Sequence, residues 1–579
     1  MKNHSIKYLY HNLKRSPFYL LAATSSEIFA TVGALFISSL IGKTLDLALY
    51  PNQVDFDKIL KNLLVIGLVT LLGAIFRFTA SFYSATLSYR TESFIRKEMF
   101  KKINITSLKQ IDSTPHGDIV CRIINDLEIL GEGIFQFFTQ IFSGVTIAIG
   151  SILFLGLTNL IIMSIVLSLT PLLILTSWLI TKLSYKSFRQ YANFQGNLLN
   201  LSEETISNQL IVNAFDYQDS AIKDFRKISD KMYQFGVKSQ FISSLANPSI
   251  RFVSWVIYAF VGATSAYILV KHQSITIGNI SSILIYTAQY TRPFTDFMGV
   301  IAEIQASIAS LERCTELLAK ISTQTEDLNG KNTIIQKNKI EIENVCFSYV
   351  PGISVIKNFT LNINHGEKVA LVGPTGCGKS TIINLLMRFY EPTSGNIKIG
   401  DIPINKININ SLRSMYGMIL QDTWLYSASI KDNIAYGKPT ASLDEIINAA
   451  KLANAHNFIE KLEHGYDTIL SENRDGISEG QKQLLSIARV MLTQPKILLL
   501  DEATSNIDTR TELKIQDTFN KMMQGKTCII VAHRLSTIKN ADKIIVMDKG
   551  QIVEIGNHKS LLSTKGFYYK LYNSQLPTQ

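Results

Sequence analysis

Six long stretches of apolar residues dominate the first part of the chain. They run over approximately 17–41, 58–82, 134–157, 160–182, 247–270 and 275–306. An α-helix needs roughly 20 apolar residues to cross a bilayer core about 30 Å thick. A bundle of buried soluble helices is the competing interpretation, but six such runs would leave little polar surface to face water. The pattern therefore predicts six membrane-spanning helices.

The links between these stretches differ in length and in charge. Those after the first, third and fifth stretches are short, whereas residues 83–133 and 183–246 form long links rich in Lys and Arg. The N-terminal segment is also basic, with Lys2, Lys7 and Lys14. Basic segments next to membrane spans stay on the cytoplasmic side, so the N-terminus and both long links are predicted to face the cytoplasm. Helical periodicity in the links predicts that the spans continue beyond the membrane.

The second part of the chain has a different pattern of polar and apolar residues. Residues 321–339 are polar and form a predicted linker, and short β-branched runs then alternate with helical segments from 340 to 579. This alternation is typical of an α/β domain. The predicted fold is an all-α six-helix transmembrane domain at 1–320, followed by an α/β domain at 340–579.

Composition and charge narrow the class of protein. Hydrophobic residues make up 46% and charged residues 18% of 579 residues, and the formal net charge is +11. An excess of basic residues favours binding to nucleic acid or to anionic lipid. Six membrane spans, however, exclude a soluble ATPase that acts on nucleic acid. The five cysteines are scattered, without metal-ligand spacing or pairs typical of a disulfide framework. We therefore expect the cysteines to be reduced thiols. We also expect the lipid bilayer to be a partner of the protein.

A phosphate-binding loop follows the strand predicted near residue 370. The pattern GxxxxGK[ST] is formed by Gly373, Pro374, Thr375, Gly376, Cys377, Gly378, Lys379 and Ser380, and Thr381 follows it directly. It lies between a strand and a helix, as that motif requires. Glycines allow backbone amides to point at phosphates, Lys379 reaches the β- and γ-phosphates, and Ser380 can ligate Mg²⁺. ATP and Mg²⁺ are the predicted ligands.

An acid pair ends a second apolar strand. Residues 497–500 run into Asp501 and Glu502. An acid at the carboxyl end of a strand beside the phosphate loop suits Mg²⁺ coordination, and a second acid can polarise the attacking water. A strand-end acid pair in a turn is the bland alternative, and the phosphate loop argues against it. Asp501 is the predicted metal ligand and Glu502 the predicted catalytic acid.

With these motifs in view, the whole chain resembles the ATP-binding cassette exporters of the multidrug and lipid-flippase type. Residues 477–481, Ile-Ser-Glu-Gly-Gln, resemble the family signature LSGGQ. The resemblance implies nucleotide contacts for Ser478, Gly480 and Gln481, metal and nucleotide contacts for Gln421, adenine stacking for Tyr349, and γ-phosphate sensing for His533. It also implies that residues near 117–128 and 211–219 are cytoplasmic coupling segments that dock on the cassettes.

The resemblance further implies a mechanism. Two cassettes pair head to tail, and each ATP lies between the phosphate loop of one and the signature helix of the other. ATP hydrolysis would drive export of an amphipathic or hydrophobic compound, such as a drug, lipid or peptide, across the cytoplasmic membrane by alternating access. Two other functions stay open: a nucleotide-gated regulator or sensor, and an importer on the exporter fold. Glu502 and His533 favour hydrolysis over sensing.

One departure from the family pattern points to a particular assembly. Glu479 replaces the first glycine of the signature's central pair, while Glu502 is intact. A carboxylate there would lie near the partner's γ-phosphate and weaken that site. The combination of an altered signature with an intact Glu502 resembles the intact-glutamate subunit of bacterial heterodimeric multidrug exporters. A heterodimer with a second half-transporter is therefore favoured over a homodimer, and a harmless substitution in a homodimer is the alternative.

Ionisable residues within the predicted spans are candidates for substrate contact. They are Glu27, Arg77, Arg292 and Asp296. Arg292 and Asp296 lie one helical turn apart, so we expect them to pair with each other, and a structural role is also favoured for Arg77. Glu27 could meet a cationic substrate or carry a proton, and a structural role is an equal alternative for it. The aromatic residues Phe135, Phe137, Phe138, Trp255, Tyr258, Tyr286 and Tyr290 could line a cavity, face lipid or pack.

Overall fold

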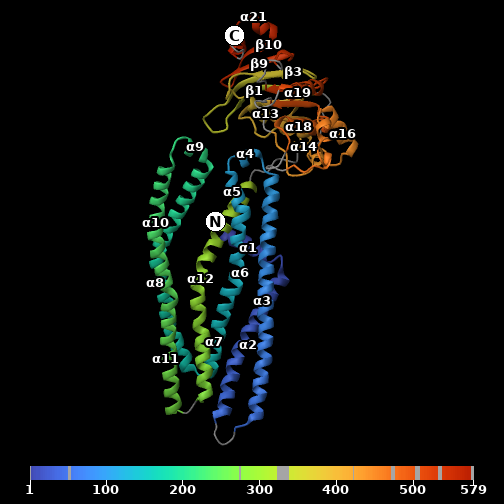
Figure 1. The fold of residues 1–579 in the computed structure, drawn as a ribbon. Coiled ribbons are helices and arrows are strands. Elements are labelled where there is room, and N and C mark those ends of the chain that lie inside the picture. The colour runs from blue at the N-terminus through green and yellow to red at the C-terminus, as the bar shows by residue number, and fades with distance from the viewer. Residues whose placement is uncertain are drawn as a thin grey trace. The chain divides into compact units, whose positions relative to one another are not determined.

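The structure is a computed structural model, and it describes residues 2–49, 54–272, 275–322, 338–420, 423–470, 476–501, 509–531 and 538–574. The chain divides into two compact units (Figure 1). One unit contains residues 1–104 and 115–323, and the other contains residues 105–114 and 324–579. We call the first the helical unit and the second the cassette.

The described part of the helical unit consists of helices. They are α1 (Lys2–Leu13), α2 (Pro17–Leu49), α3 (Phe56–Asn104), α5 (His116–Cys121), the π-helical turn η1 (Arg122–Asp126), α6 (Leu127–Gln136), the π-helical turn η2 (Phe137–Phe142), α7 (Ser143–Thr158), α8 (Leu160–Ser207), α9 (Gln209–Ala214), α10 (Gln218–Ser244), α11 (Ala246–His272) and α12 (Ile277–Ser322). The long ones lie side by side in Figure 1. The predicted continuation of the spans is confirmed, because α3, α8 and α12 each have more than forty residues.

Five helical segments of the described chain are long and apolar enough to cross a membrane. They are Pro17–Leu49, Phe56–Asn104, His116–Thr158, Leu160–Ile180 and Gln218–Lys271. The sixth predicted span lies in α12, which is not one of the five and carries Arg292 and Asp296 in that stretch. The third and fourth spans are separated by Asn159, whose side chain accepts hydrogen bonds from Ile161 N and Ile162 N and so caps α8. The count of six spans stays a prediction.

The surface of the helical unit is strongly apolar. None of the residues in the most hydrophobic stretch of α3 is buried, and Leu64, Leu68 and Phe78 are among its exposed side chains. A soluble monomer rarely exposes such a continuous apolar face. Helices satisfy their backbone hydrogen bonds internally, so they tolerate a lipid environment. The protein is therefore a multi-pass membrane protein.

The described residues of the cassette form two sheets. The antiparallel sheet has the order β2-β1-β4-β5, and the six-stranded sheet has the order β10-β9-β3-β8-β7-β6. The strands are β1 (Ile340–Phe347), β2 (Ile356–Ile363), β3 (Lys368–Val372), β4 (Ser394–Ile399), β5 (Ile402–Pro403), β6 (Tyr416–Ile419), β7 (Ile497–Asp501), β8 (Thr527–Val531), β9 (Lys543–Asp548) and β10 (Gln551–Gly556). Strands β9, β3, β8, β7 and β6 are parallel and β10 is antiparallel.

Helices cover the sheets and complete the α/β domain. They are α4 (Leu108–Asp112), α13 (Lys379–Leu386), α14 (Ile409–Ser414), α15 (Ile430–Ala435), α16 (Leu443–Leu452), α17 (His456–Ile459), α18 (Glu479–Thr493), α19 (Thr509–Met522), α21 (His558–Ser563) and α22 (Phe567–Ser574), with short 3-10 turns at Ile404–Lys406 and Gly465–Asp467. The predicted fold class, an all-α membrane domain followed by an α/β phosphate-loop domain, is confirmed.

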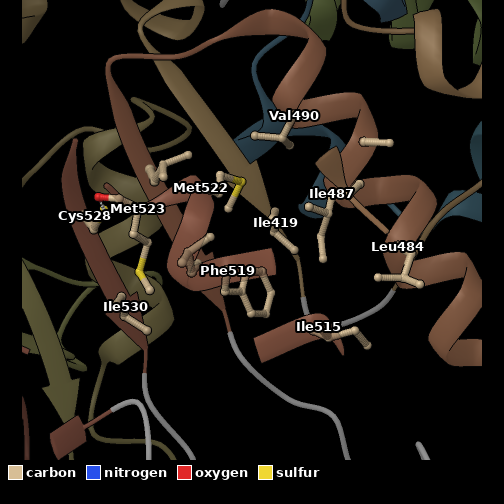
Figure 2. Packing of buried hydrophobic residues seen from close by; sticks show 14 of the residues in the cluster. Ile419, Leu484, Ile487, Val490, Ile515, Phe519, Met522, Met523, Cys528 and Ile530 are labelled. Atoms are coloured by element: carbon tan, nitrogen blue, oxygen red, sulfur yellow. Dashed lines mark hydrogen bonds between the residues drawn. The ribbon is translucent and has the colours of Figure 1, made fainter. Parts of the chain in front are cut away.

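One core packs against the parallel sheet on the side of α18 and α19. Figure 2 shows Leu484, Ile487 and Val490 of α18 near Ile419 of β6, with Phe519 of α19 beside them. The spacing of three residues places the α18 side chains on one face of the helix. Burial of this face anchors the helix that begins at the signature.

Candidate nucleotide-binding site

Strand register brings the phosphate loop and Asp501 to the same edge of the parallel sheet. Strand β8 lies between β3 and β7, and Val531 pairs with Leu371 on one side and with Asp501 on the other. The carboxyl ends of parallel strands meet at one edge, where ligands of α/β folds bind. Residues 373 and 501 are distant in sequence, so this meeting is a product of the strand order.

The loop conformation requires glycine at three positions, one of which is Gly376 with φ of +82°. Gly378 immediately precedes α13 and has φ of +101°, in the left-handed region that side chains rarely adopt. A Cβ on Gly373 would lie 2.2 Å from the carbonyl oxygen of Met547, so this glycine allows the loop to pass close to β9. The loop then turns into α13, whose first backbone amides have no helical acceptors and can face an anion.

Lys379 is a buried cation in this loop. The residue is 6% exposed, and its Nζ donates to the carbonyl oxygens of Gly373 and Pro374 at 2.9 and 3.0 Å. No carboxylate of the described chain lies within salt-bridge distance of it. A buried ammonium with only neutral partners is costly unless an anion balances it. The loop therefore fits a phosphate group.

Ser380 and Asp501 form the second part of the site. Ser380 Oγ lies 3.3 Å from Asp501 Oδ2. A hydroxyl oxygen and a carboxylate oxygen are the hard ligands that Mg²⁺ prefers, so this pair fits the predicted metal. Gln421, Glu502 and His533, and the residues 471–475 before the signature, lie outside the described residues.

Tyr349 lies beside the phosphate loop on an aromatic cluster. Its ring makes edge contacts with Phe347 and Tyr390 at centroid distances of 4.8 and 5.0 Å. Its hydroxyl donates to Thr381 Oγ1 at 3.3 Å and accepts from Asn384 Nδ2 at 3.2 Å. Because these contacts fix the ring while 42% of the residue stays exposed, Tyr349 can offer a flat surface to a base.

The signature residues begin α18. The Ser478 side chain accepts from Gln481 N, and Gln481 Oε1 accepts from Ser478 N at 2.8 Å, which is a capping box. Gly480 is buried, whereas the Glu479 side chain is 54% exposed and lies 3.8 Å from Lys482 Nζ. At that exposure and distance the ion pair neutralises little of the Glu479 charge.

A short helix from the first half of the chain belongs to the cassette, which the sequence analysis missed. Leu108 of α4 packs against the cassette core, and the Tyr390 hydroxyl donates to the Asp112 carboxylate. The first coupling segment was predicted near 117–128, but those residues lie in α5, η1 and α6 of the helical unit. The coupling role of residues 117–128 stays a prediction.

The second predicted coupling segment, residues 211–219, contains most of α9 and the start of α10. Ile211 and Phe215 are among its exposed apolar side chains.

The charged residues of the predicted spans form two ion pairs in the helical unit. Arg77 Nη1 lies 2.6 Å from Glu27 Oε1, a pairing that the sequence analysis did not anticipate. Arg292 Nε lies 3.6 Å from Asp296 Oδ2, as expected from their spacing. Of the candidate aromatic residues, Tyr286 and Tyr290 are buried in the helix core, and Trp255 is exposed. Phe135 and Phe138 line a cavity.

Fold and site together define a membrane protein whose apolar helices are joined to a phosphate-loop nucleotide-binding domain. Two family models match: the ABC transporter transmembrane region over residues 20–294, and the ABC transporter domain over residues 356–505. The chain belongs to the ABC transporters. It binds ATP and is an ATPase coupled to transport, which confirms the resemblance drawn from the motifs.

Several relatives match most of the chain. A fatty acid ABC transporter ATP-binding/permease protein of Mycobacterium tuberculosis is 37% identical over 82% of this chain and 75% of its own length. An uncharacterized ABC transporter ATP-binding protein of Bacillus subtilis, YfiC, is 34% identical over 96% and 91%. An ATP-dependent lipid A-core flippase of Syntrophus aciditrophicus is 34% identical over 83% and 80%. ABC half-transporters of this kind dimerise and handle lipid or amphipathic substrates.

Proposed function

We propose that this protein is one half of an ATP-driven exporter that moves an amphipathic or hydrophobic compound, such as a lipid, drug or peptide, out of the cytoplasm by alternating access. The observation that carries the proposal is the buried Lys379 in a phosphate loop, in a chain that also exposes long apolar helices. The printed names of two relatives, a fatty acid transporter and a lipid A-core flippase, support a lipid-like cargo.

Each residue of the proposed nucleotide site has a role. Lys379 and the backbone N–H groups of residues 375–381 would hold the phosphates, and Tyr349 would stack on adenine. Ser380 and Asp501, with Gln421, would hold Mg²⁺, which neutralises phosphate charge when bound. Glu502 would orient and polarise the attacking water, and His533 would contact the γ-phosphate. Ser478, Gly480 and Gln481 would face the nucleotide of the partner cassette.

The assembly is proposed to be a heterodimer in the cytoplasmic membrane, with the N-terminus and the cassette in the cytoplasm. Glu479 supports the asymmetry, because its half-exposed carboxylate is poorly neutralised and would repel a γ-phosphate across the interface. The basic long links support the orientation. The proposed membrane domain comprises residues 1–320, the proposed linker residues 321–339, and the proposed nucleotide-binding domain residues 340–579.

ATPase activity in lipid nanodiscs tests the proposal. The full chain is compared with the Glu502→Gln variant, alone and co-expressed with its neighbouring half-transporter. We expect activity only with the partner, and we expect the substitution to lower it by at least about 100-fold, because the proposed acid positions the water. Activity of the chain alone that is lost in Glu502→Gln would replace the heterodimer with a homodimer. Activity unaffected by Glu502→Gln would overturn the catalytic assignment.

A further inference from the structure

Two adjoining cavities lie within the helical unit, each with a volume of about 350 Å³. Arg77, Thr139 and Gln140 line both of them. The first, which we call the polar cavity, is also lined by Thr31, Arg292 and Asp296. The second, which we call the aromatic cavity, is also lined by Phe135, Phe138 and Phe142. Polar and apolar walls thus meet at Arg77.

The charged side chains around these cavities differ in their exposure. The Glu27 side chain is 6% exposed and its Oε1 is in contact with Arg77 Nη1, whereas the Arg77 side chain is 53% exposed. The carboxylate therefore lies behind the guanidinium and holds it in place, while further N–H groups of Arg77 stay available. The Arg292 side chain is 80% exposed, and its long contact with Asp296 leaves most of its donors available as well.

Two guanidinium groups on one cavity are suited to a particular chemistry. The planar donor fork of arginine matches a carboxylate or a phosphate with two parallel hydrogen bonds. Charged groups within membrane helices are costly and mark substrate pathways. Thr31 is buried on the wall of the polar cavity, and its Oγ1 has no hydrogen-bond partner in the described chain, so it can donate to an anion there.

Helix irregularities at the same place give independent support. The π-helical turn η2 carries Thr139 and Gln140 into both cavities. Pro293 interrupts the backbone hydrogen bonding of α12 beside Arg292 and lines the polar cavity. Such turns are frequent at functional sites, and in membranes they are tolerated where they line a cavity.

We infer that the two cavities bind an amphiphile with an anionic head group, with the carboxylate or phosphate between Arg77 and Arg292 and the hydrocarbon along Phe135, Phe138 and Phe142. Glu27 is a positioning residue that orients Arg77. This inference rests on the proposed export of an amphipathic compound and specifies the charge of its head group.

Ligand displacement without nucleotide tests the inference. A fluorescent fatty acid bound to the full chain in zwitterionic nanodiscs is displaced by four competitors: dodecanoate, dodecyl phosphate, dodecanol and dodecyltrimethylammonium. The two anions are expected to displace the probe at concentrations at least about tenfold lower than the other two, given the strength of paired charge-assisted hydrogen bonds. Inorganic phosphate, the free-anion arm, is expected not to compete, and equal competition by it would overturn the amphiphilic part of the inference.

Matched variants locate the effect. Arg292→Gln should weaken dodecanoate binding at least about tenfold and leave dodecanol unchanged, since only the ion loses a bidentate partner. Arg251→Gln, at an exposed arginine of α11 away from both cavities, should change neither. Because Arg77→Gln alone would leave Glu27 unpaired and buried, the double variant Glu27→Gln/Arg77→Gln is used, and it should lose the preference for the anions. Glu27→Gln alone should reduce that preference.

Two outcomes separate this inference from the proposed function. If all four competitors act equally and Arg292→Gln changes none of them, the anionic site is wrong, while ATPase activity that depends on Glu502 would still support an exporter. If head-group selectivity depends on Arg292 but ATP hydrolysis does not depend on Glu502, the site stands and the proposed catalytic assignment fails.

Discussion

At the scale of single residues, the phosphate loop contains a charged side chain, Lys379, beside a neutral one, Cys377. Lys379 is a buried cation whose partners are two carbonyl oxygens and, at 3.9 Å, the Cys377 sulfur. Burial raises the pKa of the Cys377 thiol. That thiol is thus a neutral packing group, and Gly373 leaves room for its sulfur. The positive charge of Lys379 consequently stays available for a phosphate.

Cys346 and Cys377 should differ in reactivity with pH. Hydrogen bonds from Ser394 and from the Asn358 N–H hold the pKa of the Cys346 thiol below its ordinary value. A lower pKa gives more thiolate at a given pH, and the thiolate is the reactive form. In a Cys121→Ser background, iodoacetamide should label Cys346 several-fold faster than Cys377 at neutral pH. Mass spectrometry of digested protein measures both rates.

The Cys346 labelling rate should fall only when the pH drops through that lowered pKa, whereas labelling of Cys377 should begin at more alkaline pH. Ser394→Ala is the matched control, because it removes the first of the two hydrogen bonds and should slow labelling of Cys346 alone. Faster labelling of Cys377 than of Cys346 would contradict the assignment of its thiol as buried and neutral.

At the scale of elements, α4 is joined to the nucleotide side of the cassette through one tyrosine. The Tyr390 ring contacts the Tyr349 ring, and its hydroxyl donates to Asp112. Burial and this hydrogen bond raise the pKa of Tyr390, so the hydroxyl stays a donor throughout the physiological range. Tyr390 therefore links the proposed adenine platform to a helix from the first half of the chain.

Removing that hydroxyl should weaken coupling more than hydrolysis. Tyr390→Phe keeps the ring contact with Tyr349 and loses the bond to a carboxylate, worth about 1.5–3 kcal/mol. Basal ATPase activity should stay within about twofold, while stimulation by transported amphiphiles should fall by roughly tenfold, as that free energy implies. ATPase assays in nanodiscs with and without amphiphile measure both.

A double-mutant cycle identifies the contact. Asp112→Asn should reduce stimulation too, and the double variant Tyr390→Phe/Asp112→Asn should lose no more than Tyr390→Phe alone, because both changes remove one interaction. Tyr466→Phe is the control, since its hydroxyl bonds His456 elsewhere in the cassette. Additive losses would show that Tyr390 and Asp112 act separately.

At the scale of the whole molecule, the single chain exposes residues that a second subunit would cover. The signature helix α18 presents Glu479, and Ile211 of α9 and Phe215 directly after that helix are exposed. Apolar side chains exposed on a short helix are typical of a surface that a partner covers. Both features are understood most simply if the working transporter contains a second subunit, as the proposed function requires.

Glu479→Gly tests the asymmetry. Glycine at this position removes a carboxylate from the proposed partner site, so ATP turnover of the assembled transporter should rise several-fold, by relief of repulsion with the γ-phosphate. Glu479→Gln, which keeps the size and removes the charge, should give part of the increase. Turnover at saturating ATP and the apparent KM for ATP are measured. Unchanged turnover in both variants would remove the basis for an asymmetric pair.

The sequence by itself determined the class of protein and much of the proposed site. Apolar length fixes where helices can cross a bilayer, because lipid offers no hydrogen bonds to the backbone. The loop from Gly373 to Thr381 has a local conformation set by its own glycines. The strand that ends at Asp501 was likewise evident from its apolar run. These features depend on neighbouring residues in the chain, so a linear pattern is sufficient to predict them.

Only the tertiary structure decided which distant residues meet. The pairing of Glu27 with Arg77, the two cavities, and the place of α4 in the cassette each depend on helices brought together by packing. The same holds for Ser380 and Asp501, which strand order brings to one sheet edge. Periodicity assigns a residue to a face of its own element but not to a neighbour. That choice belongs to the packing of the whole chain.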